Sequence, residues 1–60
     1  MSASSPQLAR EKVGLSLHHA ARRARISASY LRRIERHGGT PYILAVRLAH
    51  LYQCSIHVFI

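Results

Sequence analysis

Proline and glycine occur in this chain only where one short segment gives way to the next. Its two prolines are Pro6 and Pro41, and its three glycines are Gly14, Gly38 and Gly39. Between them, apolar residues recur every three or four positions, which is typical of helices, rather than every second position as in strands. The pattern therefore predicts an all-α fold, a compact domain of four to five short helices.

The chain length allows one domain. Sixty residues can bury only about 60% of the surface that the unfolded chain exposes, which leaves no room for two cores or for a substrate cleft. We therefore expect a single domain over residues 1–60 that is not an enzyme.

The charge balance points to a polyanionic partner. Nine Lys and Arg against two acidic residues give a net charge of +7, and a positive field of this strength favours nucleic acid as the partner. At 48% hydrophobic residues, the chain has the apolar material to fold, unlike disordered basic tails.

One cysteine and the lack of long apolar runs indicate the compartment. Cys54 cannot form an internal disulfide, which favours a reducing environment. No run approaches the roughly 18 apolar residues of a membrane span, and the first residues lack the apolar stretch of a signal peptide. We expect a cytoplasmic protein with no membrane association.

Metal binding is the main alternative use of the histidines. His50, Cys54 and His57 have helix-compatible spacing, but a structural zinc site needs four ligands, usually in recognisable pairs. We therefore expect no metal, no cofactor and no small-molecule ligand, with Cys54 as a small apolar core residue.

Capping residues divide the chain into helices. A helix is expected after each of four candidate N-caps, which are Ser5, Ser16, Ser27 and Thr40. Gly14 ends the first helix, and the fourth runs to about Tyr52. We expect residues 1–4 to form a flexible N-terminus, whereas residues 55–60 fit either a strand or a one-turn helix.

The third expected helix has two distinct faces. At 100° per residue, Ser29 and the three arginines Arg32, Arg33 and Arg36 fall within roughly 140°. Tyr30, Leu31 and Ile34 occupy the opposite sector, which is typical of a core face. Glu35 lies at the edge of that core sector, an unusual place for an exposed acid.

Residues 15–39, LSLHHAARRARISASYLRRIERHGG, resemble the helix-turn-helix of the lambda Cro and repressor family, the xenobiotic-response-element type. The matching features include Ala21, Ala24, Ile26, the tripeptide SYL at 29–31 and IER at 34–36, and the resemblance extends over about residues 8–60. It implies a lambda-repressor-like domain with the helix-turn-helix at about 16–36 and the third helix in the major groove. The implied function is a sequence-specific transcription regulator, a repressor that binds double-stranded operator DNA.

The family pattern and the helical wheel agree on the base-reading residues. These are Ala28, Ser29, Arg32 and Arg33, since arginine can bond guanine N7 and O6 and alanine can contact a thymine methyl. The alternative is that Arg32 and Arg33 are solvated or bound to phosphate.

Backbone phosphates are expected at two helix ends. The candidates are Ser16, Leu17, Tyr30, Arg36, His37, Gly38, Gly39 and Thr40. For Tyr30, packing in the core is the alternative, which its wheel position favours.

The resemblance also implies a structural ion pair between Arg10 and Glu35 that braces the first helix against the third. The alternative is that Glu35 pairs in water with a helical neighbour such as Arg32.

Three positions depart from the family pattern. Leu17 stands where many members have a glutamine that contacts the DNA backbone, and Ala20 where they have a larger apolar residue. Arg25 replaces a common turn glycine, and we expect a positive φ there to cost on the order of 1 kcal/mol.

The C-terminal segment has more apolar residues than a one-turn element can bury. We therefore expect a homodimer on a palindromic operator, with Val58 or Phe59 at the dimer interface. Two other functions stay open: a protein-interaction or antitoxin module with the same fold, and, less favoured, a membrane-surface binder.

Overall fold

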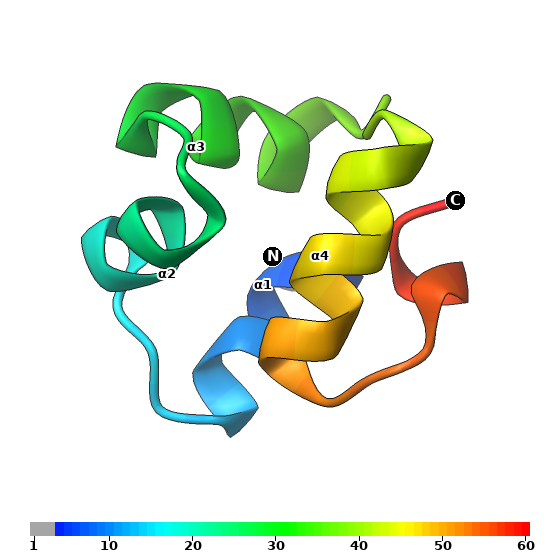
Figure 1. Cartoon of the computed structure of the whole chain (residues 1–60), viewed down its shortest axis with the longest axis horizontal. Helices are drawn as coiled ribbons and strands as arrows, with labels where there is room; N and C mark the ends of the chain where they lie inside the picture. The colour runs from blue at the N-terminus through cyan, green and yellow to red at the C-terminus, as the bar shows by residue number, and fades with distance from the viewer. Residues whose placement is uncertain (1–3) are drawn as a thin grey trace.

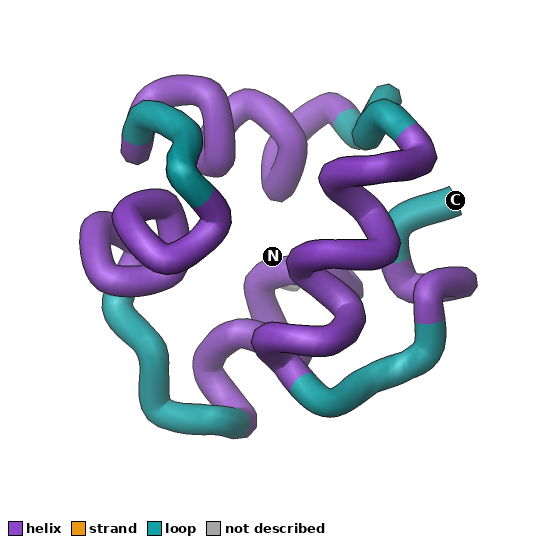
Figure 2. Tube along the Cα trace, viewed as in Figure 1, coloured by secondary structure: helices purple, strands orange, loops and turns teal. Residues whose placement is uncertain are grey.

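The computed structural model describes residues 4–60 and confirms the all-α prediction. The helices are α1 (Ser5–Lys12), α2 (Leu17–Ala24), α3 (Ala28–His37) and α4 (Tyr42–Tyr52), followed by one 3-10 turn, η1 (Ile56–Val58). Short loops connect them, and the described chain contains no strand (Figures 1 and 2). None of these helices has the length and apolar character to cross a bilayer within residues 4–60.

The caps of α2 and α3 are the predicted ones. Ser16 Oγ accepts a hydrogen bond from the His19 amide at 3.1 Å, and Ser27 Oγ accepts one from the Tyr30 amide at the same distance. Each bond satisfies an amide that has no partner within the helix.

Two predicted caps are wrong. Ser4 rather than Ser5 caps α1, with its Oγ accepting from the Gln7 amide at 3.2 Å. Within the expected flexible segment 1–4, Ser4 forms this cap, and residues 1–3 lie outside the described part of the chain. Pro41 occupies the cap position of α4 without a side-chain bond. The Thr40 hydroxyl is buried and bonds no group within residues 4–60, so it cannot act as the cap.

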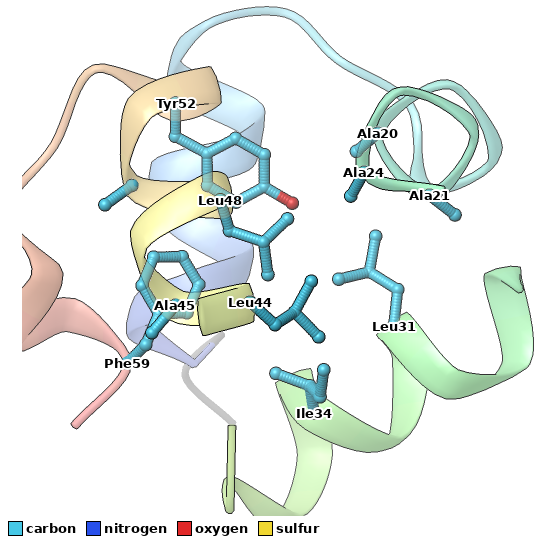
Figure 3. Close-up of a cluster of buried hydrophobic side chains, with 11 residues drawn as sticks. Ala20, Ala21, Ala24, Leu31, Ile34, Leu44, Ala45, Leu48, Tyr52 and Phe59 are labelled. Carbon is cyan, nitrogen blue, oxygen red and sulfur yellow. The ribbon is translucent and has the colours of Figure 1, made fainter. Parts of the chain in front are cut away.

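The core lies where α2, α3 and α4 meet. Leu31 and Ile34 of α3 and Leu48 of α4 are its largest fully buried side chains (Figure 3). They pack toward α2, whose buried side consists of three small residues, Ala20, Ala21 and Ala24. Because alanine side chains are small, α2 packs close to both neighbouring helices. The other large buried side chains of the core are Leu44, Tyr52 and Phe59.

The C-terminal segment forms a turn of helix. Ser55 caps η1, and Phe59 turns inward to lie with its ring centroid 5.9 Å from that of Tyr52. Phe59 is 7% exposed, so its own chain already covers it and it is removed from the expected dimer interface. Val58 stays partly exposed, and Ile60 is exposed.

Arg25 ends α2 in the left-handed conformation, as its place in the family pattern predicted. Its φ is 61° and its ψ is 41°, and its amide donates to the carbonyls of the last turn of α2. In this conformation a residue with a Cβ is less favourable than glycine by about 1 kcal/mol.

Replacing Arg25 with glycine is expected to stabilise the domain by about 0.5 kcal/mol, because relief of the left-handed strain exceeds the entropy that glycine adds to the unfolded chain. In a domain of this size the melting temperature should rise by a few degrees. Arg25→Ala is the matched control, since it removes the same charge but keeps the Cβ. An equal gain in both variants would assign the effect to charge and not to backbone conformation.

Candidate nucleic-acid interface

The outward side of α3 is a basic surface, hereafter the α3 face. It is a shallow groove lined by exposed residues, namely Ser29, Arg32, Arg33, Arg36 and His37. The opposite side of the same helix is buried through Leu31, Ile34 and Glu35. The helical period places these two sets on opposite sides, because residues three and four apart share a face.

Two residues lie differently from the sequence expectation. Ala28 is half-buried at the start of α3 and packs against the core, so of the four expected base-reading residues only three lie in the groove. Tyr30 is 37% exposed rather than packed in the core. Tyr30 is therefore not among the buried side chains, and it does not line the groove of the arginines.

An ion pair fixes α3 against α1. Arg10 Nε donates to Glu35 Oε2 at 2.7 Å and Arg10 Nη2 donates to Glu35 Oε1 at 3.3 Å. Both residues are 8% exposed, and this is the bidentate geometry in which arginine holds a carboxylate most firmly. The Arg10–Glu35 pair that the resemblance implied is therefore confirmed. The alternative, in which Glu35 is solvated and pairs with a neighbour on its own helix, is wrong.

Arg10 also holds the loop that leads into α2. Its Nη1 donates to the Leu15 carbonyl at 2.9 Å, so one guanidinium connects α1, the α1–α2 loop and α3. The hydrogen bond from Arg10 to Glu35 raises the pKa of the guanidinium, against an opposing effect of burial. Arg10 therefore carries its positive charge at neutral pH.

Arg47 makes a contact that sequence reasoning missed. Its Nη1 donates to the Ala24 carbonyl at 2.9 Å, which joins α4 to the last turn of α2. The carbonyls at a helix end lack intrahelical partners, and a guanidinium is a favourable donor there. The sequence carries no signal for how α4 crosses α2, and this crossing is what brings the two groups together.

The candidate phosphate-binding groups lie at two ends of the helix-turn-helix. Ser16 and Leu17 open α2, and Leu17 shares a polar groove with Arg32 and Arg36. At the other end, Gly38 ends α3 at φ 77° and ψ −153°, a conformation that only glycine adopts readily. The buried Thr40 hydroxyl is not oriented for a phosphate, whereas His37, Gly38 and Gly39 are exposed.

Tyr52 lies near the ion pair without bonding to it. Its ring is 2% exposed, and its hydroxyl is buried with no partner in residues 4–60. Burial, followed by the negative charge of Glu35, raises the pKa of Tyr52 to about 12. The folded state therefore holds the phenolic proton more tightly than the unfolded state does.

The raised pKa of Tyr52 predicts a loss of stability at alkaline pH. Between its unfolded pKa near 10 and its folded pKa of about 12, the native state binds more protons, so stability falls as the pH rises. Between pH 9 and pH 11, the free energy of unfolding should fall by about 1 kcal/mol more in the wild type than in Tyr52→Phe. Denaturant titration at each pH measures this difference. The same loss in both proteins would show that other groups cause it.

A family model described as a helix-turn-helix domain matches residues 7–38, more than half of the 60-residue chain. The match spans α1, α2 and α3, which contain the ion pair and the basic groove. The chain belongs to this family of helix-turn-helix domains. No curated protein and no solved structure matches it.

Proposed function

We propose that the chain is a sequence-specific regulator of transcription that binds double-stranded DNA through α3 in the major groove. It acts as a repressor in the cytoplasm, binds a palindromic operator as a homodimer, and carries no catalytic activity. The helix-turn-helix family supports a DNA-binding regulator, and the geometry and charge of α3 support the reading of base sequence.

The α3 face is the observation that carries this proposal. It presents three arginines and a serine on one side of a ten-residue helix whose other side is buried. An α-helix fits the major groove of B-DNA, and arginine can bond guanine there in bidentate fashion. The exposed Arg22, Arg23 and Arg25 of the neighbouring α2 region add positive charge that favours the phosphate backbone.

The fixed orientation of α3 supports reading of sequence rather than general attraction to charge. Base contacts need side chains held in register with base edges. The Arg10–Glu35 pair connects α3 to α1, and the bond from Arg47 to the Ala24 carbonyl holds α2 against α4. The arginines of α3 therefore project from a braced helix.

Substitution of the α3 arginines tests the proposal. Arg32→Ala or Arg33→Ala is expected to lose about 1 to 3 kcal/mol of binding to a duplex selected from a random pool, and much less on random duplex. Arg23→Ala is the matched control, because Arg23 is an exposed arginine of α2 outside the α3 groove.

The control should weaken both duplexes to a similar extent, as expected for loss of a phosphate contact or of general charge. Fluorescence anisotropy at fixed salt measures both duplexes for every variant. If Arg32→Ala and Arg33→Ala each lose equal binding free energy on selected and random DNA, the two arginines contribute only general charge. That result would contradict base reading.

A further inference from the structure

The set of side chains that the α3 face offers to base edges is narrow. In the major groove, arginine bonds the N7 and O6 of guanine, asparagine and glutamine bond adenine, and aspartate and glutamate accept from the amino group of cytosine. The whole sequence contains no asparagine and no aspartate. Its glutamines, Gln7 and Gln53, lie on α1 and at the end of α4. The α3 face therefore has neither of the residue types that read adenine.

The acid that α3 does contain is not available to a base. Glu35 is buried and holds Arg10 through both carboxylate oxygens, at 2.7 Å and 3.3 Å. The other glutamate, Glu11, lies on α1 and accepts a hydrogen bond from Gln7 at 3.1 Å. The α3 face therefore has no carboxylate that could accept a hydrogen bond from cytosine.

Thymine also lacks a specific partner on the α3 face. Its distinguishing group in the major groove is a methyl, which apolar side chains contact. Ala28 is half-buried against the core, and Tyr30 does not line the groove of the α3 face. Ser29 does line it, but a hydroxyl both donates and accepts, so it bonds more than one base. Guanine is therefore the base for which the α3 face has a specific partner.

The three arginines of the α3 face have different surroundings. Arg32 and Arg36 also border a second groove, which is lined in addition by Gln7 of α1 and Leu17 of α2. Leu17 opens α2, and a helix start is where a backbone phosphate is expected. Arg33 lies in the groove of the α3 face and does not border the second groove. Arg33 is therefore the arginine that lies farthest from the expected phosphate and is free to bond a base.

We propose that the domain selects DNA by guanine, and that Arg33 is the side chain that reads it. The inference rests on the proposed binding of DNA through α3, and it names the base that decides the choice of duplex. Arg33 donates two hydrogen bonds, to N7 and O6 of one guanine, in the stretch of major groove that α3 occupies. At the other base pairs of this stretch, exchange of one base for another has a smaller effect on the affinity.

Base analogues in a duplex selected from a random pool test the inference with the full chain. The analogue 7-deazaguanine removes the N7 acceptor and keeps base pairing, whereas inosine keeps N7 and O6 and lacks only the minor-groove amino group. At the guanine that Arg33 reads, 7-deazaguanine should weaken binding about tenfold, because one of the two hydrogen bonds is lost. Inosine at the same position should change the affinity by less than about twofold.

Two arginine variants connect the effect of the analogue to one side chain. In Arg33→Ala the affinity for the selected duplex should fall, and 7-deazaguanine at that position should have no further effect, since its donor is gone. Arg36→Ala is the matched control, because it removes an exposed arginine of the same helix face that also borders the second groove. It should weaken binding and keep the tenfold effect of 7-deazaguanine.

The outcomes separate this inference from the proposed function. A selected duplex in which 7-deazaguanine has no effect at any guanine would overturn the inference and leave sequence-specific binding of DNA intact. So would a selected duplex with only A·T pairs in the contacted stretch, or an Arg33→Ala variant that keeps the full effect at every position. If no duplex is enriched from the pool, the proposed function fails and the inference fails with it.

Discussion

Replacing Glu35 with glutamine is expected to lower the free energy of unfolding by about 3 kcal/mol, the largest effect of any single polar substitution in the domain. Glutamine keeps the size of the side chain but removes the charge opposite Arg10, whose Nε lies 2.7 Å from the carboxylate. The guanidinium, 8% exposed, would be left buried without a counter-ion. A domain of 60 residues has a total stability on the order of 5 kcal/mol, so a large part of it would be lost.

Glu11→Gln is the matched control for this substitution. Glu11 is the other acid of the chain, and it is exposed and bonded to Gln7 across one turn of α1. Its replacement should change stability by less than about 0.5 kcal/mol. Urea unfolding compares the two variants, and a double-mutant cycle with Arg10→Met isolates the pair. Additive and small losses in the cycle would show that the pair does not brace α3.

Replacing Leu48 with alanine is expected to lower the free energy of unfolding by about 3 kcal/mol, because Leu48 is fully buried in a small core. Leu48 is 0% exposed and faces Leu31 from the opposite side of the core (Figure 3). The alanines of α2 cannot shift to fill the cavity, since their backbone already packs closely against α4. Loss of a buried leucine therefore costs both its transfer free energy and the cavity it leaves.

Ile43→Ala is the control for the core substitution, since it shortens an aliphatic side chain of the same helix that is 74% exposed. We expect a change within about 0.5 kcal/mol at protein concentrations at which the chain is monomeric. Urea unfolding measures the stability of both variants. If the dependence of the free energy on urea concentration is unchanged, the shift of the midpoint gives the change in stability. A loss below about 1 kcal/mol for Leu48→Ala would show that the core closes around the missing side chain and that Leu48 is not essential to its packing.

The two faces of α3 were predictable from the sequence because they depend on local geometry. The helical period alone separates Arg32, Arg33 and Arg36 from Leu31 and Ile34. Ser16 and Ser27 were equally predictable as caps, since the cap bond spans only three residues.

Contacts between distant elements were not predictable from residue patterns. The bond from Arg47 to the Ala24 carbonyl depends on how α4 crosses α2, and the inward turn of Phe59 depends on the position of Tyr52. Thr40 has a good capping side chain, yet its hydroxyl is buried instead. The Arg10–Glu35 pair joins residues 25 positions apart, and it was anticipated only through the family resemblance.

The proposal that this helix-turn-helix domain binds a particular DNA sequence can be tested directly. The most direct measurement is a mobility assay at about 150 mM salt, with a duplex selected from a random pool and an excess of mixed-sequence competitor. We expect the selected duplex to stay bound in the presence of the competitor. The logarithm of the affinity should fall linearly with the logarithm of the salt concentration, with a slope of about 0.9 per neutralised phosphate. If no duplex is retained above the competitor at any salt, the α3 face does not read sequence. A basic module that binds an acidic protein would then be the better description.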